Sequence, residues 1–326
     1  MKENTTYPLI SVVMPIYNTA RYLRKSIPSV MAQDYPNLEI VLLNNGSTDE
    51  SDTIIREYAQ QDHRIKFFEI THVSTVKESR DNAIARATGD WIVSVDSDDS
   101  IDNHHVSKLW LRHIETNAEW VCGRMKYKEG DKELPIVIPS LDFDMNTVMS
   151  GEEAMLRTLF NWEIGLNGSL RKRSIFSNLI TEHSDFFYTD ECDTRMYLNN
   201  CNKVAFADTT YWVTCNHDSV SRTPSATGIL YPLITVVGLC QYFNKRYGRH
   251  SILSEGAVIQ LYRVYIKSFD YMSRNIDSVA KQLNDFHKKR IKEAFLSLSD
   301  RRDIIGLCRY YRCKYLYIRY QKMLKI

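Results

Sequence analysis

The stretch Val95-Asp96-Ser97-Asp98-Asp99-Ser100-Ile101-Asp102 carries three carboxylates within four residues, directly after the apolar run Trp91–Val95. The apolar run predicts a buried strand. Ligands of open α/β sheets bind at the carboxyl ends of the strands, so the aspartates predict a ligand site. Mg²⁺ and similar cations bind carboxylates together with substrate phosphates, which suits a nucleotide diphosphate carried on a metal. Because Asp and Ser also form turns and cap helices, a ligand-free acidic turn is the alternative.

The composition is typical of a globular protein with an apolar core. Of 326 residues, 44% are hydrophobic and 25% charged, and the net charge of +2 excludes a strongly acidic or basic binding protein. The seven cysteines include no Cys-x-x-Cys pair, so we expect reduced thiols in the cytoplasm. Residues 1–8 lack the apolar segment of a signal peptide. The most apolar segment, Gly228–Phe243, is too short to span a bilayer and predicts a packed helix, with shallow membrane contact as the alternative.

Strand-like apolar runs alternate with helical patterns through residue 95. Runs at 9–14, 39–43 and 65–69 precede Trp91–Val95, and residues with helical spacing separate them. This alternation is typical of a parallel sheet with right-handed crossovers and predicts an α/β fold. Further along the chain we expect helices at 106–114 and 151–160 and from 190. Strands are expected at 120–125, 203–207 and 211–214, a hairpin or long loop at 126–150, and mostly helix from about Pro224.

Three segments in this order resemble the signatures of family 2 glycosyltransferases of the GT-A fold: Ile10–Asn18, Asn44–Asp49 and Val95–Asp99. The resemblance covers about residues 9–222. It implies a Rossmann-like, mostly parallel sheet flanked by helices, with a C-terminal helical extension. Residues 1–224 would form the catalytic domain, with a nucleotide-sugar half at about 9–102 and an acceptor half at about 103–224. Residues 225–326 would form a helical C-terminal region.

The resemblance implies that the first two loops bind the nucleotide. Pro15, Tyr17 and Asn18 match the loop that packs against it, and Tyr17 can stack on a base. Asn44 matches the position of an aspartate that binds uracil, and Asn45 follows where the family has a second acid. An asparagine carbonyl still accepts a hydrogen bond, but without charge. A tyrosine packed on the core, and asparagines that only form the turn, are the alternatives.

Arg80 matches an arginine that braces the sheet site and faces the diphosphate. Lys77, one helical turn earlier, could share that role, and a solvated helix face is the alternative for both residues.

Asp96, Ser97 and Asp98 match the family's Asp-x-Asp motif. The resemblance implies that Asp96 and Ser97 contact the nucleotide, that Asp98 and Asp96 bind a divalent metal, Mn²⁺ or Mg²⁺, and that Asp99 supports the donor sugar. His217 is a candidate third metal ligand.

Two residues are implied to act around the donor and acceptor sugars. Arg222 lies in a segment that resembles the one over the donor site and is a candidate clamp. Trp162 precedes a segment that resembles the family's acceptor side and can stack on an acceptor sugar, with a core tryptophan as the alternative.

Asp190 and Glu191 resemble the family's Glu-Asp motif in reversed order. Glu191 matches the catalytic base, which takes the proton from the acceptor hydroxyl as that hydroxyl attacks, and Asp190 lies beside it. Adjacent acids move each other's pKa apart, which helps one remain basic. Acids that merely favour the first turn of a helix are the alternative.

The C-terminal tail, residues 301–326, mixes basic and aromatic residues with aliphatic ones. This pattern suits an interfacial helix on an anionic membrane. A helix docked on the catalytic domain or forming a homo-oligomer is the alternative, and the low net charge argues against a nucleic-acid partner.

We therefore expect a metal-dependent, inverting glycosyltransferase, which is either a hexosyltransferase or an N-acetylhexosaminyltransferase. It would move a sugar from a nucleotide diphosphate donor, expected to be a UDP-sugar, to a hydroxyl of a surface polysaccharide or glycolipid. Its expected location is the cytoplasm, peripheral on the inner face of the membrane. A degenerate sugar-nucleotide-binding scaffold and a nucleotidyltransferase are the alternatives, although no Gly-rich basic loop follows Pro15.

Overall fold

The computed structural model describes residues 7–73, 75–134, 144–160, 167–176, 189–215 and 226–274, together with 289 and 292. The chain divides into two compact units, one of residues 1–179 and 194–216, the other of residues 180–193 and 217–326. Each unit is described by itself below. The expected division into a nucleotide-sugar half, an acceptor half and a helical region stays a prediction.

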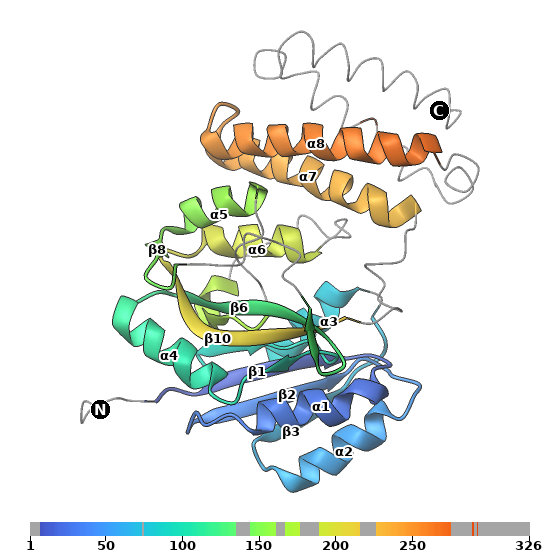
Figure 1. The fold of residues 1–326 in the computed structure, drawn as a ribbon, viewed down its shortest axis with the longest axis vertical. Helices are drawn as coiled ribbons and strands as arrows, with labels where there is room; N and C mark the ends of the chain where they lie inside the picture. Colours follow the sequence, from blue (N-terminus) through green and yellow to red (C-terminus); the bar gives the residue numbers. More distant parts are fainter. Residues whose placement is uncertain are drawn as a thin grey trace. The chain divides into compact units, whose positions relative to one another are not determined.

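A ten-stranded sheet forms the centre of the first unit as far as the structure describes it (Figure 1). Its strand order is β3-β2-β1-β4-β9-β6-β10-β5, with β7 paired to β6 and β8 paired to β10. The first four strands in the chain are β1 (Ile10–Ile16), β2 (Leu38–Asn44), β3 (Ile65–Glu69) and β4 (Trp91–Ser94). They pair in parallel, as the alternation of strands and helices predicts. Their carboxyl ends therefore lie along one edge.

The remaining strands add antiparallel pairs to this parallel half. They are β5 (Ser100–Ile101), β6 (Trp120–Glu129), β7 (Lys132–Leu134), β8 (Val148–Met149), β9 (Leu170–Lys172) and β10 (Val204–Thr214). β6 and β10 are parallel to each other, while β9 runs antiparallel between β4 and β6. The helices of the first unit are α1 (Ala20–Met31), α2 (Ser51–Gln61), α3 (Val76–Arg86), α4 (His105–Thr116), α5 (Gly151–Phe160) and α6 (Thr189–Asn199), the last beginning in the other unit.

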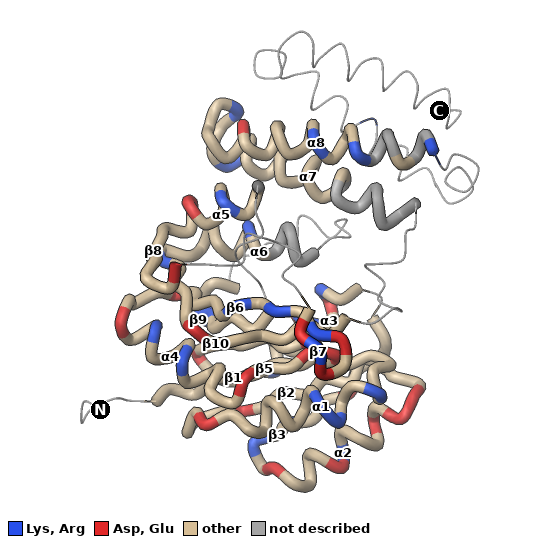
Figure 2. The backbone as a smooth tube through the Cα atoms, in the orientation of Figure 1, with Lys and Arg blue, Asp and Glu red and all other residues tan. Residues whose placement is uncertain are grey.

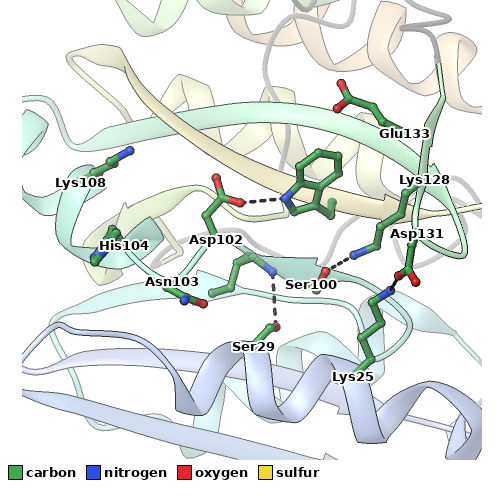
Figure 3. Close-up of a pocket in the computed structure, with 12 residues that line it drawn as sticks. Lys25, Ser29, Ser100, Asp102, Asn103, His104, Lys108, Lys128, Asp131 and Glu133 are labelled. Atoms are coloured by element: carbon green, nitrogen blue, oxygen red, sulfur yellow. Dashed lines mark hydrogen bonds and ion pairs between the residues drawn. The ribbon is translucent and has the colours of Figure 1, made fainter.

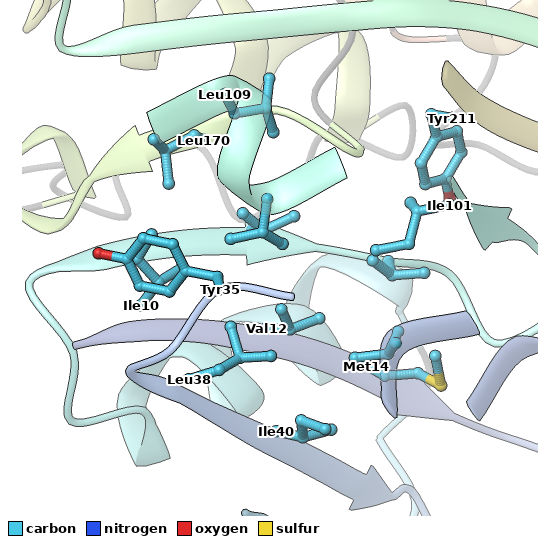
Figure 4. Close-up of a cluster of buried hydrophobic side chains, with 14 of the residues drawn as sticks. Ile10, Val12, Met14, Tyr35, Leu38, Ile40, Ile101, Leu109, Leu170 and Tyr211 are labelled. Carbon is cyan, nitrogen blue, oxygen red and sulfur yellow. The ribbon is translucent and has the colours of Figure 1, made fainter. Parts of the chain in front are cut away.

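Alternating side chains of the parallel strands build a separate core on each face of the sheet. Val12, Met14 and Ile40 belong to the larger cluster, which α1, α2 and α4 cover (Figure 4). Val13 and Val41 point to the other face, where α3 packs on them. Because both faces are buried, these strands are continuously apolar, which is why the sequence pattern predicts them well.

One segment differs from the sequence-based expectation, and another forms a strand that no apolar pattern predicts. The runs predicted as separate strands at 203–207 and 211–214 form one strand, β10, whose register shifts between Phe206 and Thr210. A bulge accommodates the intervening polar residues without ending the strand. The basic segment 170–173 contributes strand β9 to the middle of the sheet, where Arg171 is fully buried.

The second unit contains the helices α7 (Ala226–Tyr247) and α8 (Ile252–Arg274), which pack against each other. The segment Gly228–Phe243 lies within α7, and Leu233, Val237 and Phe243 are buried there. Within the described part of the chain, no helix has both the length and the apolar character needed to cross a membrane.

The buried carboxylate of Glu39 on β2 ties the parallel strands together. Ser11 on β1 donates to Oε1 and Lys66 on β3 donates to Oε2. The Thr88 hydroxyl donates to Oε2 at 2.8 Å and the Gly89 amide to Oε1 at 3.1 Å, in the turn before β4. Burial would raise the pKa of Glu39, but these hydrogen bonds outweigh it and lower the pKa to about 2.

We predict that Glu39→Gln lowers the free energy of unfolding by about 3 kcal/mol at neutral pH. The pKa of Glu39 is lower in the folded chain than its ordinary value of 4.5. Its contribution is therefore fully present above about pH 4.5 and is lost as the pH falls towards 2. Urea unfolding measured from pH 3 to pH 7 should show a shallower pH dependence for the variant.

Glu57→Gln is the matched control, because Glu57 is exposed on α2 and pairs with the exposed Arg24. It should change the free energy of unfolding by less than about 1 kcal/mol. Equal losses in the two variants would contradict the role of Glu39.

Candidate active site

The loops after β1 and β2 are joined by hydrogen bonds. The Asn18 side-chain oxygen accepts from the Thr48 amide at 2.8 Å, and the Asn18 amide donates to Ser47 Oγ at 3.1 Å. Asn18 has a φ of 50°, a left-handed conformation that asparagine tolerates better than most residues. The Ala20 amide donates to Asp49 Oδ2 at 2.9 Å. The predicted residues of these two loops therefore lie together at the carboxyl edge of the sheet.

Both asparagines after β2 use their side chains to hold the backbone. Asn44 is buried, and its side-chain oxygen accepts from the Ser47 amide at 3.0 Å. Asn45 binds Val73 twice, accepting from its amide at 2.8 Å and donating to its carbonyl at 3.0 Å. These contacts support the alternative in which the asparagines form the turn, and they leave few polar atoms for a ligand.

Tyr17 presents an aromatic surface at the edge of this loop pair. Its side chain is 44% exposed and stacks on His72, with ring centroids 4.2 Å apart and an interplanar angle of 24°. His72 follows β3, and its Nδ1 lies 3.1 Å from the Asn45 carbonyl oxygen. The sequence interpretation did not include His72, because a single histidine in a polar loop forms no pattern. An exposed aromatic stack at this edge can pack against a planar base.

The acidic loop, residues 96–102, is anchored to β10. Tyr211 donates its hydroxyl hydrogen to Asp99 Oδ2 at 2.7 Å and accepts from the Asp96 amide at 3.1 Å. The Thr214 amide donates to Asp99 Oδ1 at 2.8 Å. Both Asp99 oxygens are thus bound by the protein, which suits a supporting role better than ligand binding.

Two further contacts connect the acidic loop to its surroundings. Ser97 Oγ accepts from Thr19 Oγ1 at 2.9 Å, which joins this loop to the one after β1. The Asn167 amide group donates to Asp96 Oδ2. Asn167 Oδ1 is buried and has no hydrogen-bond partner among the described residues. The loops after β1, β2 and β4 consequently form one connected site.

The acidic loop concentrates negative charge that the described residues compensate only in part. Burial raises the pKa of Asp99 well above its usual range, and the nearby Asp96 and Asp98 raise it further. Burial also raises the pKa of Asp98, and Arg21 offsets this effect in part. A divalent cation would relieve this repulsion, so the local charge fits a metal.

The described residues include no group of three His, Cys, Asp or Glu side chains placed to hold a metal ion. Mg²⁺-type sites that use one or two carboxylates and substrate phosphates need no third protein ligand. Asp96 and Asp98 fit that kind of site, since Asp99 is occupied by Tyr211 and Thr214.

The two basic candidates lie on α3. Arg80 is buried, with 1% of its surface exposed. Lys77 forms an ion pair with Asp81, with Nζ 2.6 Å from Oδ2, and is only partly exposed. Their role toward a diphosphate stays a prediction.

The remaining candidates fall outside the described residues. These are Trp162, His217 and Arg222. Asp190 and Glu191 lie in the first turn of α6, but their side chains are not among those described. Their roles stay predictions.

The structure adds residues that sequence reasoning missed, notably Tyr211 and Asn167. Both are far from the acidic loop in sequence, and each binds a backbone or side-chain atom of Asp96. Apolar periodicity identified Tyr211 only as part of a strand. No local pattern signals a hydroxyl that reaches across the sheet.

Comparison of the sequence with models of known protein families identifies the family of this chain. The model of glycosyl transferase family 2 matches residues 11–188, more than half of the chain. The chain belongs to glycosyl transferase family 2. This confirms the expected family and the enzyme class, a glycosyltransferase, and it argues against the nucleotidyltransferase alternative.

Relatives within family 2 include glycosyltransferase GlyG from Streptococcus pneumoniae, which is 28% identical over 222 residues. That match covers 66% of this chain and 73% of GlyG. An uncharacterized glycosyltransferase from Haemophilus influenzae is 32% identical over 154 residues, covering 47% of this chain and 61% of the relative.

Solved structures confirm the GT-A fold. S. aureus TarS 1–349 in complex with UDP-GlcNAc superposes with a TM-score of 0.63 at 16% identity, covering 97% of this chain and 90% of that one. The mannosyltransferase PcManGT from Pyrobaculum calidifontis, in complex with GDP-Man and Mn²⁺, gives a TM-score of 0.53 at 16% identity, with coverage of 90% and 86%.

We predict that Tyr211→Phe weakens Mn²⁺ binding and lowers the free energy of unfolding by about 1–3 kcal/mol. The variant leaves the buried Asp99 oxygen and the Asp96 amide without their shared partner. Mn²⁺ affinity, measured by electron paramagnetic resonance of the free ion, and urea unfolding test the two effects.

Tyr35→Phe is the matched control. Tyr35 is also buried, and its hydroxyl donates to the Pro8 carbonyl at 2.8 Å, before the start of β1. It should lose similar stability and keep its Mn²⁺ affinity. Equal weakening of Mn²⁺ binding in both variants would show that Tyr211 has only a general structural role.

Proposed function

We propose that this chain catalyses the metal-dependent, inverting transfer of a sugar from a nucleotide diphosphate donor to a hydroxyl of a surface polysaccharide or glycolipid. The observation that carries the proposal is the connected site formed by the loops after β1, β2 and β4, in which the acidic loop brings Asp96, Asp98 and Asp99 close together. We assign catalysis to residues 1–224, with the nucleotide-sugar half at about 9–102 and the acceptor half at about 103–224.

In this proposal the nucleotide lies at the loops after β1 and β2. The stacked rings of Tyr17 and His72 offer a surface for the base. A UDP-sugar is the expected donor, and GDP-sugars are the alternative, because Asn44 and Asn45 supply no charged acceptor for uracil. Pro15, Asn18 and Ser97 would shape the pocket around the nucleotide.

Asp96 and Asp98 would hold the divalent cation, Mn²⁺ or Mg²⁺, with His217 as a candidate third ligand. When bound, the cation offsets negative charge on the leaving diphosphate. Lys77, Arg80 and Arg222 are the candidate residues for further phosphate contacts.

Glu191 is the proposed base, with Asp190 beside it. The acceptor hydroxyl oxygen attacks the anomeric carbon and gives its proton to the carboxylate of Glu191. The bond from the anomeric carbon to the diphosphate oxygen breaks, and the nucleotide diphosphate leaves with the electron pair. A single displacement inverts the anomeric centre. Trp162 is the candidate to stack on the acceptor sugar, and Asp99 to support the donor sugar.

The test is nucleotide release from a panel of UDP-, GDP-, dTDP- and CMP-sugars with Mn²⁺. Wild type should release one nucleotide, expected to be UDP, and chelation by EDTA should abolish release. Asp98→Asn should lower the rate at least about 100-fold, since it removes a metal carboxylate. Asp208→Asn is the control, because Asp208 is exposed on β10 and pairs with Arg124; its rate should equal wild type.

The same assay separates the base from its neighbour. Glu191→Gln should lower kcat about 100- to 10,000-fold, the usual contribution of a general base, while the KM for the donor changes little. Asp190→Asn should have the smaller effect. Donor binding without turnover, even with acceptor lipids, would favour the scaffold alternative. Release of sugar 1-phosphate would indicate attack at the α-phosphate and hence a nucleotidyltransferase.

We further propose that the tail, residues 301–326, holds the enzyme peripherally on an anionic cytoplasmic leaflet. Eight basic residues against one acid carry the argument. They are Arg301, Arg302, Arg309, Arg312, Lys314, Arg319, Lys322 and Lys325, against Asp303. Tyrosines interleaved with leucines and isoleucines supply the apolar side of such a helix.

We predict that the full chain floats with phosphatidylglycerol liposomes at low salt and that deletion of residues 301–326 abolishes flotation. Basic residues near an anionic surface contribute about 1 kcal/mol each, and salt screens this attraction. Phosphatidylcholine liposomes are the control and should retain little protein. Unchanged flotation after the deletion would contradict the proposal. If the full chain is an oligomer in solution and the deletion variant a monomer, the tail forms the homo-oligomer instead.

A further inference from the structure

A second pocket of about 670 Å³ lies in the first unit, apart from the residues assigned to the nucleotide and the metal. It is bordered by α1, the segment from β5 to α4, and the strands β6, β7 and β10 (Figure 3). Lys25, Lys128 and Asp131 gather at one end, while Asn103, His104 and Lys108 lie at the other. The volume is within the range of small-molecule sites, about 300–1,000 Å³.

An indole ring gives the pocket its apolar surface. Trp212 on β10 is partly exposed, and its Nε1 donates to Asp102 Oδ1 at 2.8 Å, which fixes the ring. The Thr210 amide donates to the other Asp102 oxygen at 3.0 Å. Ile101 also lines the pocket. A ring fixed in this way is preorganised for stacking, because little side-chain freedom is lost when a ligand binds.

Hydrogen-bond donors and acceptors both surround this apolar surface. Lys128 is 8% exposed, and its ammonium group donates to Ser100 Oγ while two of its hydrogens remain for other acceptors. The exposed Asn103 amide can both donate and accept. Lys25 Nζ lies 3.0 Å from Asp131 Oδ1, so one end of the pocket contains an ion pair. Its ammonium group can donate to a ligand hydroxyl, and its carboxylate can accept from one.

The charges that line the pocket are balanced. Three lysines, Lys25, Lys108 and Lys128, face three acids, Asp102, Asp131 and Glu133. Basic and acidic residues are accordingly mixed near α1, β7 and α4 instead of forming a patch of one sign (Figure 2). Such a lining disfavours a phosphate or another strongly charged ligand, which would need net positive charge.

From these features we infer that the pocket is a second saccharide-binding site, which takes a neutral oligosaccharide segment. A sugar ring offers a C–H face for Trp212, and its hydroxyls both donate and accept, as the mixed lining requires. The balanced charge matches an uncharged ligand.

The last three residues of the acidic loop line the pocket, whereas the aspartates assigned to the metal lie at the beginning of that loop. Ser100, Ile101 and Asp102 line it, and they directly follow Asp98 and Asp99. A saccharide bound there contacts the segment whose earlier residues form the proposed catalytic site. In a transferase that extends a glycan, the pocket would retain a distant part of the acceptor; this last statement rests on the proposed function.

The experiment is an array of neutral tri- to hexasaccharides of glucose, galactose, N-acetylglucosamine and rhamnose, with sulfated and phosphorylated counterparts, probed with the labelled full chain. No nucleotide or acceptor reaction is involved, so the outcome is independent of transfer. Wild type and Asp98→Asn should retain the same neutral oligosaccharides. Calorimetry with the best-bound array oligosaccharide should give about tenfold weaker binding for Trp212→Leu and about threefold weaker binding for Asn103→Ala.

Lys203→Ala is the matched surface control, because Lys203 is exposed before β10 and does not line the pocket. Asn103→Ala guards against misfolding as the cause, since the Asn103 side chain is exposed, whereas Trp212 is only partly exposed and is bound to Asp102. No retention of any neutral oligosaccharide, selective retention of the phosphorylated ones, or loss of binding in Asp98→Asn would each overturn the inference. If saccharide binding persists while every donor stays intact, the proposed transferase function fails and the site stands.

Discussion

The anchoring of the acidic loop to β10 is the constraint on which the site depends. Four aspartates follow β4 within seven residues, and β10 binds the carboxylates of two of them. Asp99 accepts from Tyr211 and Thr214, and Asp102 accepts from Trp212 and Thr210. These bonds use the carboxylates that would otherwise compete for a cation. We assign the cation to Asp96, whose Oδ2 also accepts from Asn167, and to Asp98, in a loop positioned by a strand more than 100 residues away. A loop fixed in this way offers preorganised charge, which is what an electrostatic catalyst needs.

The Asn44-Asn45 pair, where this chain departs from the family's acids, has a structural explanation. Each asparagine donates and accepts at once: Asn44 accepts from Ser47 and donates to Asp52 at 3.4 Å, and Asn45 does both with Val73. An ionised aspartate only accepts, so it could not make either pair of bonds. Asn45 therefore joins the β2 loop to the segment after β3, and Asn44 joins it to the start of α2. In the proposed function, the exposed stack of Tyr17 and His72 therefore offers the surface for the base in place of a charge after β2.

The two ends of the acidic loop belong to two different proposed sites, the second pocket and the metal site. Asp102 contributes to the pocket through its bond with Trp212, while Asp98, four residues earlier, belongs to the proposed metal site. The same anchoring strand thus serves both places. If the proposed acceptor is a growing polysaccharide, a second contact would raise the effective concentration of its chain end.

The sequence by itself determined the parallel half of the sheet, the order of its loops and the family. The strands β1, β2 and β4 are buried on both faces, so their apolar runs are continuous and their polar ends stand out, as in Val95–Asp99. Only the tertiary structure decided which polar atoms remain for a ligand. Tyr211 and Asn167 bind Asp96 from distant parts of the chain. Arg171 is buried in a strand that the sequence pattern does not predict, because residues 171–173 are all basic. Periodicity reports which face of an element is buried, whereas the hydrogen-bond partners of a carboxylate depend on strand order and register, which no local pattern encodes.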